Sequence, residues 1–173
     1  GHLGHPINSM LDMHTDATMN ASWFGSHIVE CEANELMKYY NEVTSEEIIS
    51  AEKQILGFFD TPDPVSDPIS MKLTDDDLHM AAKVSVALSN FVKSEKLDGL
   101  AYYYDGPEES EVRKVMSNLI VGNSLLTAEH IPMCGESDLK TLIALLIFDR
   151  LGIGGSFAEF HPVDFNDGFV LVG

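Results

Sequence analysis

Apolar residues recur every three to four positions in several stretches of the chain, a spacing that is typical of amphipathic helices. In shorter stretches they alternate or run together between turn-forming residues, as they do in strands. The pattern predicts helices over residues 16–24, 33–43, 45–59, 74–96, from about 108 into the 120s, and 139–151. It predicts strands over residues 26–32, 99–105, 131–134, 156–160 and 169–173, and a proline-rich loop or hinge over 60–74.

The order of these elements indicates the class of fold. From residue 99 onward, strands alternate with helices, which implies a mostly parallel sheet with helices on both faces. We therefore expect a doubly wound α/β fold, a three-layer sandwich of the Rossmann or flavodoxin type. In such open sheets, ligands bind beyond the carboxyl ends of the strands, near a switch in strand order.

Composition narrows the class of protein. With 173 residues, of which 45% are hydrophobic, the chain can bury one core, so we expect a single domain over residues 1–173. The 28 acidic and 10 basic residues give a net charge of -18, which repels nucleic acids and anionic membrane surfaces. No apolar run is long enough to span a bilayer. We therefore expect neither a nucleic-acid partner nor a membrane.

The cysteines and the two ends of the chain bear on where the protein works. Cys31 and Cys134 are too few and too far apart in sequence for a disulfide framework, so buried thiols in a reducing cytoplasm are the expectation. The chain starts without Met and stops within a strand pattern. These ends favour an excised piece of a longer protein, in which Gly1 and His2 would be a vector remnant.

Two glutamates stand beside strongly apolar elements. Glu136 follows the strand predicted over 131–134, and Glu159 falls near the end of the strand predicted over 156–160. If those strands were neighbours in the sheet, both carboxylates would converge, and their repulsion would favour a divalent cation such as Mn²⁺ or Mg²⁺ between them. Two simpler interpretations remain open: Glu136 favours a helix dipole, and Glu159 points to solvent from an edge strand.

A second group of candidate ligands lies near the start of the chain. The stretch "DMHTD" holds Asp12, His14 and Asp16 at spacings that a metal could use. We favour a polar loop that caps the following helix, because no second cluster nearby supports a metal.

The two glutamate motifs resemble a known family. The stretches "GESDLKT" over 135–141, "GGSFAEF" over 154–160 and "GFVLVG" over 168–173 match, in order and spacing, the middle domain of the L-arabinose isomerase and L-fucose isomerase-like family. A looser likeness includes "LGHPINSMLDMHTD" and "GLAYYYD" and covers most of the chain. The two glutamate motifs carry the specific part of the resemblance.

The resemblance implies a Mn²⁺-dependent aldose–ketose isomerase that acts on a sugar through a cis-enediol. Carried over, Glu136 and Glu159 bind the metal and exchange protons with the substrate, and the residues alone leave open which of them is the base. The strand matching "GLAYYYD" contributes to the sugar pocket, which makes Tyr103, Tyr104 and Asp105 candidate substrate-binding residues. Ordinary strand aromatics remain the alternative for the tyrosines. The implied substrate is a pentose or a deoxyhexose, and the implied assembly is a homo-oligomer.

Two further residues are candidates for supporting these glutamates. Lys140 matches the family motif and is expected either in solvent or as a partner of Glu136, and His161 follows Glu159 by two residues and could donate a hydrogen bond to it. A structural histidine is the alternative for His161. The resemblance implies that the metal's histidine ligands lie outside this chain, so we expect weak Mn²⁺ binding and no isomerase activity from these 173 residues alone. A domain that binds a sugar or a protein partner without chemistry is the alternative function.

Overall fold

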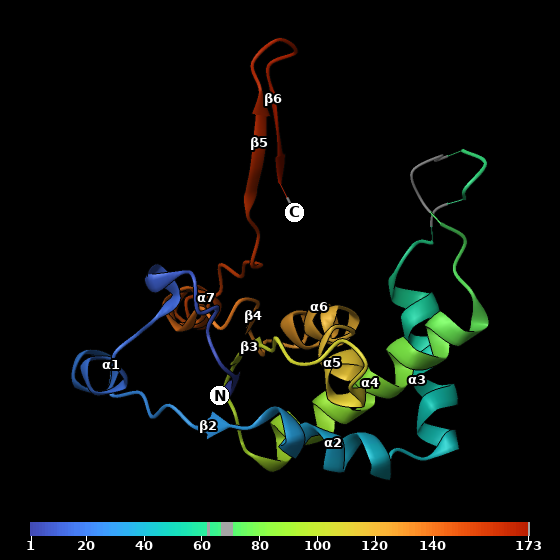
Figure 1. The fold of residues 1–173 in the computed structure, drawn as a ribbon, viewed down its shortest axis with the longest axis horizontal. Helices are drawn as coiled ribbons and strands as arrows, with labels where there is room; N and C mark the ends of the chain where they lie inside the picture. Colours follow the sequence, from blue (N-terminus) through green and yellow to red (C-terminus); the bar gives the residue numbers. More distant parts are fainter. Residues whose placement is uncertain (62, 67–70, 173) are drawn as a thin grey trace.

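A four-stranded parallel sheet forms the centre of the computed structural model, which describes residues 1–61, 63–66 and 71–172 (Figure 1). The strands are β1 (His2–Gly4), β2 (Glu30–Cys31), β3 (Leu100–Tyr103) and β4 (Met133–Cys134), in the order β2-β1-β3-β4. The register pairs Leu3 with both Cys31 and Tyr102, and Ala101 with Cys134.

Helices cover both faces of this sheet. On one side lie α1 (Ala17–Phe24) and α7 (Leu139–Arg150), and on the other lie α2 (Ala33–Glu42), α4 (Asp75–Ser94), α5 (Glu111–Met116) and α6 (Ile120–Ala128) (Figure 1). The helix α3 (Ser45–Phe58) packs on α4, and a short 3-10 turn, η1, spans Leu11–Met13. This arrangement confirms the α/β, doubly wound class expected from the sequence.

The core follows from the alternation of side chains along the strands. Leu100 and Met133 belong to a large cluster with Leu36, Leu88 and Phe91 of the helices α2 and α4. The next residue on each strand faces the other way, so Ala101 and Cys134 pack with three leucines of α7 (Leu139, Leu142 and Leu145). The sheet is therefore buried on both faces, with α7 as the main cover of one of them.

The predicted helices are largely confirmed, with one exception. The helix expected from about 108 into the 120s is two helices, α5 and α6. Around the break, the Ser117 hydroxyl donates to the backbone carbonyl of Arg113, and the Asn118 side chain donates to that of Lys114 at 2.7 Å. Such local side-chain bonds compete with the continued helical ladder. The strand expected over 26–32 is shorter, and β1 was not predicted. The expected loop over 60–74 is only partly described, because residues 62 and 67–70 lie outside the described residues.

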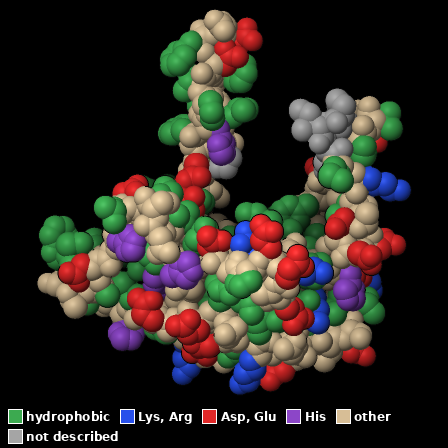
Figure 2. Space-filling model, in the orientation of Figure 1, with side chains coloured by type: hydrophobic (Ala, Val, Ile, Leu, Met, Phe, Trp, Pro, Cys, Tyr) green, Lys and Arg blue, Asp and Glu red, His purple; other side chains and the backbone are tan. Residues whose placement is uncertain are grey.

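The two last predicted strands do not join the parallel sheet. β5 (Phe160–Asp164) and β6 (Phe169–Val172) form a separate antiparallel hairpin that projects from the body. The strand predicted over 156–160 is wrong, because Phe160 alone of these residues lies in β5 and Glu159 precedes it. The condition that this strand neighbours β4 is not met either: among the described residues, β4 pairs with β3. Hydrophobic side chains line the hairpin in Figure 2, and Phe160 and Phe165 are 84% and 89% exposed. Among the described residues, no helix is long and apolar enough to cross a membrane.

Candidate active site at the carboxyl edge of the sheet

The switch in strand order lies between β1 and β3. After β1 the chain forms β2 on one side of it, and β3 then pairs on the other side. The carboxyl ends of β1 and β3 thus open the crevice in which ligands of this fold class bind. At this place His5 donates its backbone N–H to the Tyr103 carbonyl at 3.2 Å, and the two rings meet edge to face with centroids 5.9 Å apart.

A glycine permits this close approach. Gly4 ends β1 with φ +87°, and a Cβ at that position would lie 1.9 Å from the Tyr103 carbonyl oxygen. A side chain would therefore be strained by the backbone conformation and would also collide with the neighbouring strand. Gly4 is the residue that lets β1 and β3 meet at their carboxyl ends.

The three residues predicted to bind substrate all lie at this edge. Tyr103 and Tyr104 are half-buried, and Asp105 is exposed. The Asp105 carboxylate forms an ion pair with Arg113 Nη1 at 3.0 Å, and the same nitrogen donates to the Gly106 carbonyl at 2.6 Å. Asp105 therefore has a partner within the protein that fixes the turn after β3, while its role toward a sugar stays a prediction.

Glu136 sits in a strained turn between β4 and α7. Glu136 and Ser137 have φ of +57° and +58°, a left-handed backbone conformation that residues other than glycine rarely adopt. The turn is held by the Ser137 N–H, which donates to the Tyr102 carbonyl at 3.1 Å, and by Asp138, whose Oδ1 accepts from Lys140 N at 3.0 Å and Thr141 N at 3.1 Å. Strain of roughly 1–3 kcal/mol for each such residue is a cost that clusters at functional sites.

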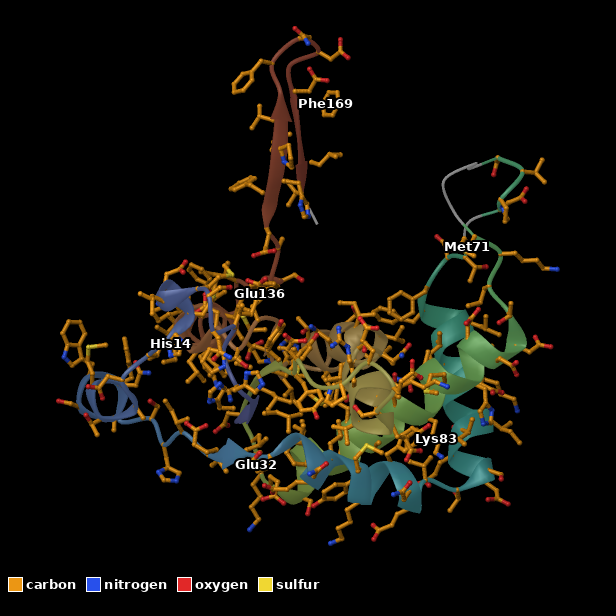
Figure 3. The ribbon with its side chains drawn as sticks, in the orientation of Figure 1. His14, Glu32, Met71, Lys83, Glu136 and Phe169 are labelled. Atoms are coloured by element: carbon orange, nitrogen blue, oxygen red, sulfur yellow. The ribbon has the colours of Figure 1, made fainter. Side chains whose placement is uncertain are left out.

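The structure brings the two predicted glutamates together. Burial and the neighbouring Glu159 carboxylate raise the pKa of Glu136, and the charges of Asp138 and Asp12 add to the effect. The Glu136 Oε2 atom is buried and has no hydrogen-bond partner among the residues that the structure describes. Two adjacent carboxyls with an unpaired buried oxygen either share a proton or hold a cation. Figure 3 places Glu136 near the base of the hairpin.

Other residues singled out in the sequence are Lys140, Asp16 and His161. The Lys140 ammonium donates to the Asp12 backbone carbonyl, which ties α7 to the loop that carries Asp12 toward Glu136. Asp16 caps α1 by accepting from Thr18 N at 2.8 Å and Met19 N at 3.1 Å, so the capping interpretation of this loop is confirmed for Asp16. His161 is exposed on β5, and its predicted support of Glu159 stays a prediction.

Sequence reasoning missed His5, because a three-residue strand at the start of the chain carries too little pattern to be recognised. It did single out Asp12 as a possible metal ligand, but it did not place Asp12 beside Glu136. Over the described ranges, no three His, Cys, Asp or Glu side chains are grouped so as to hold a metal ion by themselves. The carboxyls of Glu136 and Glu159 do lie near each other, and carboxylate oxygens are ligands that an oxygen-preferring cation accepts.

The comparisons with known proteins add no relative. No protein-family model matches the chain, and no curated protein matches it either. The resemblance to the L-arabinose isomerase and L-fucose isomerase-like family therefore rests on the glutamate motifs of the sequence.

Proposed function

We propose that this chain is the glutamate-bearing domain of a divalent-metal-dependent aldose–ketose isomerase. The observation that carries the proposal is the approach of Glu136 and Glu159, which come from separate segments 23 positions apart and meet at the carboxyl edge of the sheet. The charge repulsion and the unpaired Glu136 oxygen both oppose folding, and each is offset when a cation binds between the carboxylates.

The residues present fit Mn²⁺ or Mg²⁺, since both ions accept carboxylate oxygens. Glu136 and Glu159 would hold the ion, which when bound polarises the oxygens on C1 and C2 of the sugar. One carboxylate removes the proton from C2 of the aldose, which leaves a cis-enediolate with its charge on O1. The O2 hydroxyl proton moves to O1, and the carboxyl group that took the C2 proton returns it to C1, which gives the ketose.

Two other parts of the proposal concern the protein's surroundings. Cys31 and Cys134 are both free and buried, and burial raises the pKa of Cys31 to about 11, so both fit a reducing compartment such as the cytoplasm. The exposed apolar side chains of the β5–β6 hairpin fit the homo-oligomer that the resemblance implies.

Calorimetry with Mn²⁺ on the 173-residue chain tests the proposal directly. We expect weak, EDTA-reversible binding that becomes at least about tenfold weaker in Glu136→Gln and in Glu159→Gln. Glu109→Gln is the matched control, because Glu109 is exposed and is not among the groups that act on Glu136. Equal Mn²⁺ affinity in the wild type and in Glu136→Gln would refute the metal site.

A second measurement tests the reaction. In an active isomerase that contains this domain, either glutamine variant should lose ketose formation from an aldopentose or a deoxyhexose. Near-normal turnover by either variant would remove the glutamates from the mechanism. Sugar binding that survives chelation, with no ketose formed, would instead favour the non-catalytic binding domain.

A further inference from the structure

We propose that Phe157 is the positioning residue that places Glu159 against Glu136, an inference that rests on the proposed function of this pair. Phe157 lies two residues before Glu159, and two residues of extended chain reach at most roughly 7 Å. Fixing the Phe157 ring therefore restricts where the Glu159 carboxyl can go.

The segment that carries Glu159 has little else to hold it. Residues 153–159 form no helix or strand, and over residues 151–159 every side chain is exposed except that of Phe157, which is half-buried. The hairpin that follows projects from the body, with exposed apolar side chains on both of its strands (Figures 1 and 2). Glu159 is therefore anchored from its amino-terminal side.

The anchor lies directly beside the other glutamate. The Phe157 ring packs on the cluster formed by Ala101, Cys134 and the leucines of α7. It also lies against Gly135, where a Cβ would be 3.2 Å from Phe157 Cε1. Gly135 immediately precedes Glu136, and Phe157 lies two residues before Glu159. The contact between the Phe157 ring and Gly135 is therefore close in sequence to both glutamates.

This geometry assigns a role to Gly135 as well. Its φ is not in the left-handed region, so an alanine there is limited by space rather than by backbone strain. The added methyl group would press on the ring at a distance tighter than nine in ten Cβ contacts. Gly135→Ala thus shifts the Phe157 ring without removing it, and offers a second way to disturb the pair.

The experiment compares Phe157→Ala, Phe157→Leu and Gly135→Ala with Phe165→Ala, a matched control at the exposed tip of the hairpin. Nuclear Overhauser contacts between the side chains of Glu136 and Glu159 report the positioning without any metal. Mn²⁺ calorimetry on the same variants reports its consequence for binding. Phe157→Leu keeps an apolar anchor, so rescue by this variant separates positioning from a general loss of structure.

We expect Phe157→Ala to lose the Glu136–Glu159 contacts and to weaken Mn²⁺ binding by about tenfold, as loss of a residue that orients a ligand does. Phe157→Leu and Phe165→Ala should keep both, and Gly135→Ala should fall between them. Retention of the contacts in both Phe157→Ala and Gly135→Ala overturns the inference. If Phe157→Ala does not fold, Gly135→Ala decides.

Failure of the proposed function would look different. In that case the wild type would bind Mn²⁺ no better than Glu136→Gln, while the Overhauser contacts would still depend on Phe157. Mn²⁺ binding that needs both glutamates but is unchanged in Phe157→Ala would instead keep the metal site and reject the positioning role.

Discussion

Replacing Gly4 by alanine should disrupt the switch point far more than replacement of an equally left-handed glycine elsewhere. Gly4 has φ +87°, and a Cβ added to it would lie 1.9 Å from the Tyr103 carbonyl oxygen. Real Cβ atoms essentially never approach another heavy atom closer than 3.0 Å. Gly25 has φ +65° and nothing within 4 Å of an added Cβ. Alanine would therefore strain the backbone at both positions, but only at Gly4 would its methyl group collide with a neighbouring strand.

The magnitude follows from what the collision breaks. Alanine in the left-handed region costs about 1 kcal/mol, which is the whole expected effect of Gly25→Ala. In Gly4→Ala, β1 must also move away from β3, which removes the bond from His5 N to the Tyr103 carbonyl at 3.2 Å, worth about 1 kcal/mol. The edge-to-face contact of the same two residues contributes about 0.5–1.5 kcal/mol. We expect Gly4→Ala to lower the free energy of unfolding by roughly 3 kcal/mol.

Urea denaturation followed by circular dichroism measures both variants against the wild type. The expected order is a small loss for Gly25→Ala and a loss about 2 kcal/mol larger for Gly4→Ala. The same free energy of unfolding for the two variants would show that β1 and β3 do not meet as closely as described, and the switch-point geometry of the site would then be wrong.

Two other predictions concern the β4–α7 turn. Because the pKa of Glu136 is raised above its ordinary value of 4.5, the folded state holds a proton that the unfolded chain releases, and this stabilisation is lost as the pH rises through the folded pKa. In EDTA, the free energy of unfolding of Glu136→Gln relative to the wild type should therefore increase from pH 4 to pH 7, and a constant difference would contradict the raised pKa. Asp138→Ala removes the cap of α7 and should cost about 1 kcal/mol, close to the cost of Asp16→Ala at α1, as measured by urea denaturation; no loss in Asp138→Ala would contradict the capping role.

The long helices could be predicted because several local signals agree on them. For α4, the apolar period continues for five turns, and Thr74 and Asp77 form a capping box at its start. For α7, Asp138 supplies the cap and the apolar residues supply the length. Between α5 and α6 the spacing of apolar residues was misleading, because it continues through Ser117 and Asn118. The side chains of these two residues donate to backbone carbonyls of the preceding turn and help to end α5.

The hairpin was missed because alternation along a strand does not identify its partner. Residues 156–160 form a short, mostly apolar stretch of the kind that predicts a strand, yet Gly154 and Gly155 turn the chain away after α7, with φ of +74° and +150°. The sequence does contain a hairpin signal, the "NDG" stretch that separates two apolar runs. In the structure, Asp164 accepts from the backbone of residues 166 and 167, and Gly168 is left-handed at φ +74°.

The sequence predicted that Glu136 and Glu159 would meet because they would lie on adjacent strands, but in the structure they do not lie on adjacent strands. Adjacent strands would have spaced the carboxylates by the repeat of the sheet, whereas here one comes from a strained turn and the other from a segment anchored by Phe157. The sheet can place Glu136 by itself, since the turn continues the β3 register through the Ser137 bond to Tyr102. It cannot place Glu159, which depends on a single half-buried ring. The distance between the carboxylates can therefore change without any change in the sheet.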